Sequence, residues 1–456
     1  MTIFGIPATP RQLCYALGDL LVVLLAVGVA HVASTGAEGA LGAARSALVL
    51  AAATWLVLYV ADAYDASLDF RRRRELARLW AAVGLATGLA LVGDALVPRG
   101  GWGLERAGLA ALCLALLLPA WRALACQLRP DAPLRRRTLV VGDGPPARAL
   151  AEAFGATQDR VYELVGAVHD DAPGPSAAPR LGGLKDLDAA VRAHAIDQIV
   201  VACATPGDDG PLLRQLLACK ARGVHVDDMP TLYKRLTGKV PIRQASAAWL
   251  VFGPAFRGVR GVGAAAQRAL DVAIALVGAV LSAPLVAAAA LAVRLESRGP
   301  AFYLQERVGR DERPFRIVKL RTMREDAEAA TGAVWSQGEG DPRVTRVGRL
   351  LRRTRIDELP QFYNVLRGDM SVVGPRPERE PFVTQLKARV PFYGLRFAVK
   401  PGVTGWAQVR YRYGASEEDA AEKLCYELYA IQEMSPALYA VILLKTVQTV
   451  LLRPGS

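Results

Sequence analysis

The sequence predicts an integral membrane protein built from three kinds of structure. These are an N-terminal bundle of four α-helical spans, a cytoplasmic α/β domain, and a re-entrant membrane helix joined to a mainly α-helical cytoplasmic domain. Three observations predict this fold class: four apolar stretches near the N-terminus, an alternation of short strands with helices after them, and a fifth apolar stretch with basic residues on both sides. Of the 456 residues, 52% are hydrophobic, a share that calls for a search for membrane segments.

The four N-terminal apolar stretches cover residues 14–33, 47–63, 77–98 and 107–125. Each is close to the roughly 20 residues that a helix needs to cross the hydrocarbon core. Most basic residues near them follow the second and fourth stretches: Arg71 to Arg74 and Arg78, then Arg122, Arg129 and Arg135 to Arg137. By the positive-inside rule, the N-terminus, the 64–76 loop and everything after residue 126 are cytoplasmic.

Two polar residues, Asp19 and His31, lie inside or at the end of the first stretch. They could form an intramembrane polar site. The alternative is that both face the membrane interface, and this second interpretation is favoured.

An α/β pattern follows the four stretches. The run "RTLVVGDGPPARALAEAF" at 137–154 reads as a strand, a glycine turn and a helix, and residues 164–171 and 197–206 read as further buried strands. This alternation predicts a parallel sheet covered by helices.

The turn after the first of these strands has the spacing Gly142-x-Gly144-x-x-Ala147, a shortened form of the Rossmann dinucleotide fingerprint. We therefore expect a Rossmann-like domain over residues 131–255. Pro145 and Pro146 stand where the helix should offer backbone N–H groups to a phosphate, and proline has none. A structural or regulatory role is favoured over nucleotide binding.

The fifth apolar stretch, residues 271–293, is long enough to span a membrane. Basic residues lie on both sides, however: Arg257, Arg260 and Arg268 before it, and Arg294 and Arg298 after it. Pro284 in its middle removes a helical hydrogen bond and favours a kink. We predict a linker and re-entrant helix over 256–296, with Ser282 satisfying backbone groups at the break. The alternative, an ordinary kinked span, would place the rest of the chain outside.

The remaining residues, 297–456, are polar, basic and rich in Gly/Pro turns. The apolar segment 436–452 contains Lys445 and Gln448, so it is predicted to be a core or interfacial helix rather than a span. With residues 1–130 as the transmembrane region, four domains are expected in all.

The net charge of +13 indicates an anionic partner, whether nucleic acid, anionic lipid or a phosphorylated substrate. Six scattered cysteines, with no CxxC pair, predict reduced thiols and no structural zinc. Four isolated histidines make a histidine-based metal site an unfavoured interpretation.

The adjacent acids Asp357 and Glu358 precede a helical stripe that ends before Gly368. Because Pro360 is tolerated only early in a helix, the helix is expected to begin near Asp357, with both carboxylates in its first turn. Neighbouring helical side chains point about 100° apart, so the two acids suit different tasks. One can bind a divalent cation while the other attacks or abstracts. The alternative is a pair that only stabilises the helix.

Arginines surround this pair: Arg346, Arg349, Arg352, Arg353 and Arg355 come before it, and Arg376 follows in a rigid "GPRP" turn. A basic amphipathic segment can simply rest on anionic lipid. Basic side chains beside an acid pair also suit a phosphate-bearing lipid substrate, because arginines neutralise phosphates and Mg²⁺ bridges them.

Three motifs carry a resemblance. They are "SRGPAFYLQERVGRDERPFRIVKLRTM" (297–323), "RRTRIDELPQFYNVLRGDMSVVGPRPE" (352–378) and "VKPGVTGWAQVRYRYG" (399–414). In these the chain resembles the bacterial sugar transferase family, the polyprenyl-phosphate phosphoglycosyl transferases, in its large multi-span form. The segments "ASAAWLVFG" and "YGASEEDAAEKLCYELYAI" resemble the branch associated with exosortase-type exopolysaccharide systems.

The resemblance implies that residues 297–456 form a catalytic domain. It implies the reaction of a UDP-sugar with undecaprenyl phosphate to give undecaprenyl-diphospho-sugar and UMP. This would initiate exopolysaccharide or O-antigen repeat units at the bacterial inner (cytoplasmic) membrane. The expected partners are these two substrates and the membrane, without nucleic acid, and a homodimer is suggested by analogy alone.

By position, the resemblance makes Asp357 the nucleophile that forms a phosphosugar–aspartyl intermediate, and it makes Glu358 the Mg²⁺ ligand. It places Arg352 against phosphate, Arg376 against the nucleotide, and Lys319 and Arg321 near the site. There are two departures from the family pattern. The residue before the re-entrant proline is alanine, in Ser282-Ala283-Pro284, and Arg355 stands where a small side chain is common.

Two rival functions remain open. A membrane-anchored nucleotide-sugar dehydratase or epimerase would use residues 137–250, but it needs an intact fingerprint and a Tyr-x-x-x-Lys pair that this region lacks. A non-catalytic scaffold for polysaccharide export would use the basic stretches for lipid contact alone, and would show no turnover.

Overall fold

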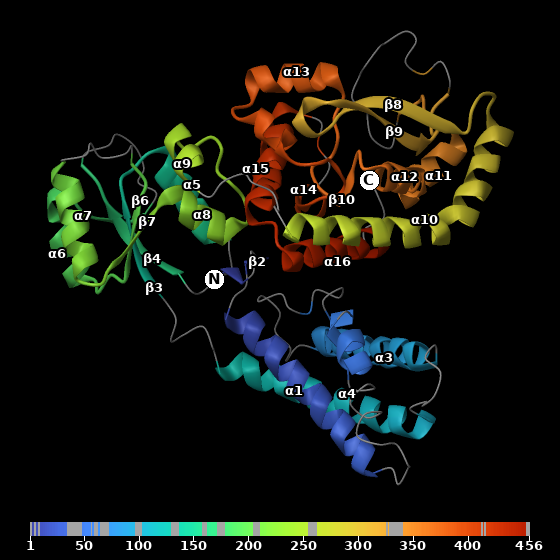
Figure 1. Cartoon of the computed structure of the whole chain (residues 1–456). Helices are drawn as coiled ribbons and strands as arrows, with labels where there is room; N and C mark the ends of the chain where they lie inside the picture. The colour runs from blue at the N-terminus through green and yellow to red at the C-terminus, as the bar shows by residue number, and fades with distance from the viewer. Residues whose placement is uncertain are drawn as a thin grey trace. The chain divides into compact units, whose positions relative to one another are not determined.

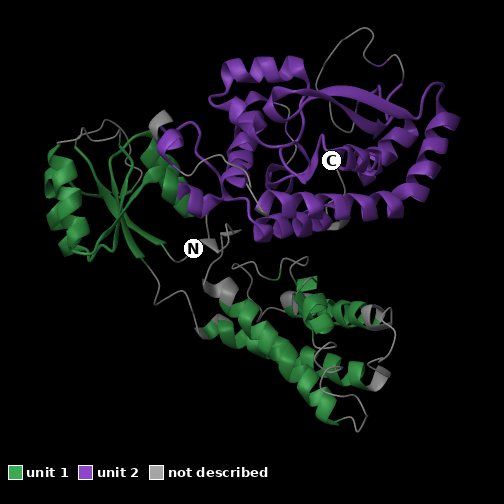
Figure 2. Ribbon diagram, in the orientation of Figure 1, with its two compact units in different colours: residues 1, 7–232 green, residues 2–6, 233–456 purple. Residues whose placement is uncertain are grey.

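The chain forms two compact units in its computed structural model (Figure 2). One comprises Met1 and Pro7–Leu232, and the other comprises Thr2–Ile6 and Tyr233–Ser456. The structure describes residues 2–3, 6–7, 10–33, 48–55, 57–58, 63, 73–95, 103–128, 136–156, 162–170, 178–203, 210–253, 262–324, 327, 341–411, 414 and 416–452. The predicted division into four domains stays a prediction.

The N-terminal helices are α1 (Pro10–Ala33), α3 (Arg73–Ala95) and α4 (Gly103–Leu128), and residues 48–55 and 57–58 are also helical. Among the described residues, three helical segments are long and apolar enough to cross a membrane: Cys14–Ala33, Arg106–Ala125 and Gly263–Glu296. The apolar part of α3, Leu79–Leu91, is shorter. The second predicted span lies partly outside the described residues, so the count of four spans stays a prediction.

A buried ion pair joins α1 to α4. The Nε and Nη2 atoms of Arg122 donate to the two carboxylate oxygens of Asp19 at 3.0 and 2.6 Å, and neither residue is exposed. A Cβ at Gly18 would overlap the Trp121 ring, which shows how closely the two helices approach. The prediction that Asp19 faces the interface is therefore wrong. Arg122, which the charge pattern assigned to a loop, is also buried. A charged group that leaves water is stabilised only if an opposite charge pairs with it, and Asp19 is that partner.

The α/β region contains a five-stranded parallel sheet in the order β5-β4-β3-β6-β7. The strands are β3 (Arg136–Val141), β4 (Tyr162–Val168), β5 (Arg180–Gly182), β6 (Gln198–Val201) and β7 (His225–Asp228). Helices α6 (Leu187–Ala193) and α7 (Pro211–Ala221) cover one face, and α5 (Pro145–Ala156) covers the other (Figure 1). The predicted alternation of strands and helices is confirmed.

The turn between β3 and α5 needs its glycine. Gly142 has a φ of +111°, and a Cβ there would lie 2.9 Å from Cys203. Pro145 is the first residue of α5, so the first two helical positions are prolines. The N-terminal end of this helix consequently lacks two of the N–H donors that a dinucleotide phosphate would use.

The fifth apolar stretch forms α10 (Val262–Glu296), which contains Pro284. Figure 1 shows α10 as two helical segments that run in different directions. The kink prediction is therefore confirmed, since proline withholds the N–H that would bond the carbonyl of Val280. The Ser282 hydroxyl donates to the carbonyl of Ala279 at 3.4 Å. Re-entrance itself stays a prediction.

Two side chains fasten the first segment of α10 to the rest of the unit. Arg268 donates to the carbonyls of Val365 and Leu366 at 2.7 and 2.9 Å. Asp271, which is 4% exposed, accepts hydrogen bonds from the Ser371 hydroxyl, the Val372 amide and the Tyr439 hydroxyl at 2.7–2.9 Å. The apolar helix is thus a fixed part of the fold that carries the acid pair.

The other strands pair as two ribbons: β8 (Phe302–Val308) antiparallel with β9 (Pro314–Leu320), and β10 (Ser371–Val373) parallel with β11 (Gly402–Thr404). The helices are α8 (Met229–Thr237), α9 (Ala247–Phe252), α11 (Arg346–Thr354), α12 (Gln361–Arg367), α13 (Glu380–Arg389), α14 (Trp406–Arg410), α15 (Glu417–Glu433) and α16 (Pro436–Leu452).

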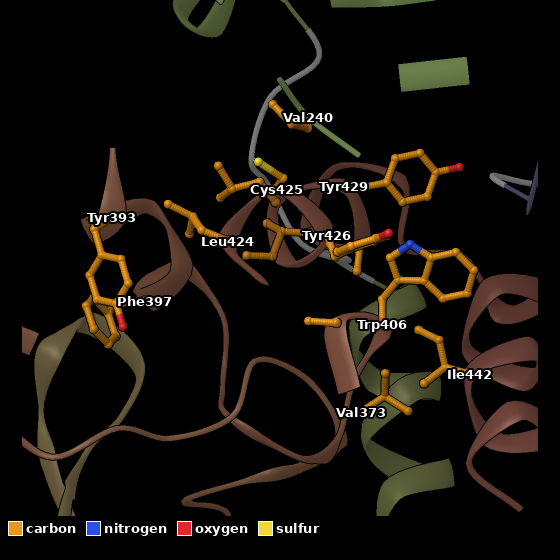
Figure 3. Close-up of a cluster of buried hydrophobic side chains, with 14 of the residues drawn as sticks. Val240, Val373, Tyr393, Phe397, Trp406, Leu424, Cys425, Tyr426, Tyr429 and Ile442 are labelled. Atoms are coloured by element: carbon orange, nitrogen blue, oxygen red, sulfur yellow. The ribbon is translucent and has the colours of Figure 1, made fainter. Parts of the chain in front are cut away.

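An aromatic core holds these elements together (Figure 3). The Trp406 ring stacks on Tyr429 with their centroids 6.1 Å apart, and its Nε1 donates to the carbonyl of Gly238. Leu438 and Ile442 of α16 are fully buried in this core. Residues 436–452 were predicted to form a core or interfacial helix. The structure confirms the core helix.

Candidate active site

The acid pair lies in a short 3₁₀ turn, Ile356–Glu358, between α11 and α12. The prediction that it occupies the first turn of the following helix is wrong, because Pro360 is the N-cap of α12 and the helix begins at Gln361. The predicted stop at Gly368 is confirmed, since this glycine has a φ of +98° and caps the helix. The acids therefore lie in a turn between two helices, and not in the first turn of α12, where the helix dipole would stabilise them.

Arg355 is one of the two departures from the family pattern. It ends α11 in the left-handed conformation, with a φ of 59°, which glycine and small polar residues adopt most readily. Its Nη1 lies 3.9 Å from Glu358 Oε1, so the larger side chain adds a cation to the site.

Glu358 is surrounded by positive charge from separate elements. Its Oε1 lies 2.7 Å from Arg376 Nη2 and 3.4 Å from Lys319 Nζ, in addition to Arg355. Burial would raise the pKa of Glu358, but Arg376 and Lys319 outweigh this effect and hold that pKa well below its usual range. Burial also lowers the pKa of Lys319, which the charge of Glu358 opposes. Glu358 is thus ionised and fixed.

Asp357 has a different environment. It is 9% exposed, and within the described part of the chain its Oδ1 has no hydrogen-bond partner. Burial, together with the neighbouring charge of Glu358, raises the pKa of Asp357 to about 6, while Lys319, Arg376 and Arg352 act in the opposite direction. A buried carboxylate oxygen without a donor is poorly solvated, and so it is well suited to bond an electrophile.

The predicted basic residues have different surroundings. Lys319 of β9 and Arg376 of the "GPRP" turn both reach Glu358. The Nε of Arg352 donates to the Thr322 hydroxyl at 2.9 Å. Arg321 donates to the carbonyls of Arg298 and Ser297, so the structure places it at the end of α10 rather than against the acids.

Glycines let two strands hold the Arg376 turn in place. A Cβ at Gly374 would lie 2.4 Å from the carbonyl of Lys400, and one at Gly402 would lie 2.1 Å from the Gly374 nitrogen. The motifs "VVGPRP" and "VKPGVTG" therefore meet backbone to backbone, which only glycine permits. Arg307 and Arg396, from other segments, also contact this turn, and no sequence pattern indicates these contacts.

The donor set suits one divalent cation of the magnesium type. Mg²⁺ is commonly bound through one or two carboxylates, with substrate phosphates completing its ligands. Asp357 and Glu358 supply two adjacent carboxylates, and the unpartnered Oδ1 of Asp357 is a buried oxygen of the required kind. Within the described residues, no group of three or more acids, histidines or cysteines is arranged so that it could hold a metal ion. The residues therefore fit an ion held jointly with substrate, rather than one caged by protein.

Parts of this chain match a known protein family and several named proteins. The family model described as bacterial sugar transferase matches residues 262–453. A UDP-N-acetylgalactosamine-undecaprenyl-phosphate N-acetylgalactosaminephosphotransferase of Aeromonas hydrophila is 41% identical over 246 residues, 53% of this chain and 56% of the relative. The chain thus spans about half the length of that relative.

Two further relatives have been named UDP-glucose:undecaprenyl-phosphate glucose-1-phosphate transferase. The protein of Caulobacter vibrioides is 47% identical over 189 residues, 41% of this chain and 69% of its own length. That of Klebsiella pneumoniae is 30% identical over 344 residues, 74% of this chain and 73% of its own length. The match thus extends over most of the chain as well as over the acid pair. The chain therefore belongs to the bacterial sugar transferase family.

Proposed function

We propose that this enzyme transfers a sugar-1-phosphate from a UDP-sugar to undecaprenyl phosphate and releases UMP. The observation that carries this proposal is the contrast between the two acids: Asp357 keeps a buried, unpartnered oxygen, and Glu358 is ion-paired to Arg376 and Lys319. One carboxylate is thus left to react while the other is held as a fixed negative charge.

The proposed chemistry proceeds in two displacements. A carboxylate oxygen of Asp357 attacks the phosphorus that bears the sugar, and the bond from that phosphorus to the bridging oxygen breaks. UMP leaves with the bonding electron pair, and a phosphosugar–aspartyl intermediate remains. A phosphate oxygen of the lipid then attacks the same phosphorus, and the Asp357 carboxylate is released.

The cations around the pair have separate tasks in this scheme. Arg376 and Arg352 would neutralise charge on the phosphates, since guanidinium groups bind phosphate oxygens in pairs. Lys319 holds Glu358 in place. Glu358 would hold Mg²⁺, which when bound lowers the negative charge of the diphosphate.

We place this reaction at the bacterial inner membrane, with the acid pair on the cytoplasmic side, as the initiating step of exopolysaccharide or O-antigen repeat-unit synthesis. The apolar helices of the chain and the positive-inside distribution of its arginines support this placement. The relatives are named for different sugars, so the sugar has to be found by assay. A homodimer stays a prediction by analogy.

The test uses the purified full chain in lipid nanodiscs with Mg²⁺, undecaprenyl phosphate and a panel of UDP-sugars. We expect UMP release with one of them in the wild type, and none above background in Asp357→Asn. Asp311→Asn is the matched control, because Asp311 is an exposed acid of the β8–β9 turn that pairs with Arg310. It should retain wild-type turnover.

Omission of the lipid acceptor isolates the first displacement. Wild type should then release about one equivalent of UMP, and the mass of the peptide that contains Asp357 should increase by one sugar phosphate. Release of UDP in place of UMP would contradict the aspartyl mechanism. Absence of both nucleotides with every sugar, in a folded protein, would favour the export scaffold.

A further inference from the structure

The turn that carries Arg376 is bound at every carbonyl from Pro375 to Glu378. The Gly402 amide donates to Pro375 at 2.8 Å, and the Val308 amide donates to Glu378 at 3.0 Å. The other two donors are side chains. Arg396 Nη2 donates to the carbonyl of Arg376 at 2.8 Å, and Arg307 Nη1 donates to that of Pro377 at 3.1 Å.

Arg396 is a buried guanidinium with a full set of partners. It is 4% exposed, and its Nε and Nη2 donate to the two oxygens of Glu427 at 2.9 and 2.8 Å. Its Nη1 donates to the Tyr393 hydroxyl at 2.6 Å. Nη2 thus serves Glu427 and the Arg376 carbonyl together, which requires the planar fork of arginine.

Arg307 approaches the turn from strand β8. Its Nη2 donates to Gln305 Oε1 at 2.5 Å, and its Nη1 lies 3.7 Å from the carboxylate of Glu378. The two arginines therefore hold neighbouring carbonyls of the turn from different elements. Neither contacts the acid pair in the described structure through an ion pair or a hydrogen bond.

The side chain of Arg376 is the part of this turn that needs positioning. It is 36% exposed, yet its Nη2 lies 2.7 Å from Glu358 Oε1. A long, partly exposed side chain has many rotamers, so its reach depends on where the backbone is anchored. Displacement of a catalytic group by about 1 Å can lower a rate by roughly 10²-fold.

We propose that Arg396 and Arg307 are positioning residues that act through Arg376, by fixing the backbone from which its guanidinium reaches the site. This inference rests on the proposed function for its kinetic consequence. Glu427 belongs to the same arrangement, because it holds the Arg396 fork against the turn.

The principal variant is Arg396→Lys, which keeps a positive charge beside Glu427 but loses the fork. We expect kcat for UMP release to fall about 10- to 100-fold, with kcat/KM falling in parallel. The control is Arg389→Lys. Arg389 of α13 pairs with Glu417 of α15, the helix that also carries Glu427, but the Arg389 side chain is 58% exposed. It should retain wild-type kinetics.

A double variant distinguishes positioning from general destabilisation. If Arg396 acts through Arg376, then Arg376→Lys and Arg376→Lys/Arg396→Lys should be slowed to the same extent. If instead the double variant were slowed by the product of the fold losses of the two single variants, the proposal would be overturned. So would wild-type turnover in Arg396→Lys.

A second measurement is independent of turnover. Hydrogen exchange of the peptide spanning residues 371–380, followed by mass spectrometry, should be at least several-fold faster in Arg396→Lys and unchanged in Arg389→Lys. Unchanged exchange in Arg396→Lys would overturn the positioning role even if the wild type turned over. A wild type that released no UMP would instead overturn the proposed function, and the exchange result would still decide whether Arg396 holds the turn.

Discussion

The buried ion pair between Asp19 and Arg122 allows a prediction whose size follows from the structure. Both residues are fully buried, and Arg122 also donates to the carbonyl of Ala63 at 2.9 Å. Removal of one partner leaves the other as a buried ion that has lost its ion pair. The expected loss is about 3–5 kcal/mol for Asp19→Leu or Arg122→Met alone, a shift of roughly 10²- to 10³-fold or more in the folding equilibrium.

The double variant Asp19→Leu/Arg122→Met should lose less than either single one. It leaves no unpaired charge, and its remaining cost is the Ala63 carbonyl without its donor, about 1–3 kcal/mol. Two apolar side chains of similar length also suit the surrounding helices, which offsets part of that cost.

The measurement is unfolding of the detergent-solubilised protein by titration with sodium dodecyl sulfate, followed by tryptophan fluorescence. Asp188→Asn serves as a control, since the ion pairs of Asp188 with Arg192 and Arg222 are solvent-exposed and their loss should change stability little. Single variants as stable as the wild type would refute the reasoning. A double variant as unstable as the sum of the single ones would refute it as well.

Three further predictions concern the acid pair and its support. The rate of UMP release should fall as the pH decreases through about 6, because Asp357 attacks only as a carboxylate and its pKa is raised to about 6. A rate that does not change between pH 5 and pH 8 would contradict this prediction. Added EDTA should abolish turnover and excess Mg²⁺ should restore it, while turnover that persists in EDTA would argue against a metal at Glu358. Asp271→Ala should lower the unfolding midpoint more than Asp271→Asn. Alanine leaves three buried donors without an acceptor, which costs about 1–3 kcal/mol of stability for each donor, whereas asparagine keeps one accepting oxygen. Equal midpoints for the two variants would contradict this role of Asp271 as a buried acceptor.

Local patterns were enough to predict most of the elements. The run of β-branched residues before Gly142 became a strand, Gly368 ended a helix, and Pro284 bent α10, because each effect depends on the backbone preferences of a few neighbouring residues. The acid pair was found for the same reason, as part of a long continuous motif.

The location of the acid pair was less accurately predicted. Helical periodicity extended the helix back to Asp357, whereas the structure places Arg355 in a left-handed turn and starts α12 four residues after the aspartate. A hydrophobic stripe continues across a 3₁₀ turn, so periodicity alone does not show where one kind of helix replaces another.

The sequence by itself determined which residues are the candidates for the chemistry, since Asp357, Glu358 and Arg376 lie within one segment whose residue types and spacing are informative. Only the tertiary structure decided which charges meet. Arg122 pairs with Asp19 from 103 residues away, Lys319 reaches Glu358 from another strand, and Arg396 supports Arg376 through its backbone. Charges attract any opposite partner at close range, so sequence alone does not select one. Burial selects the partner, because packing of the apolar residues determines which ions leave water together.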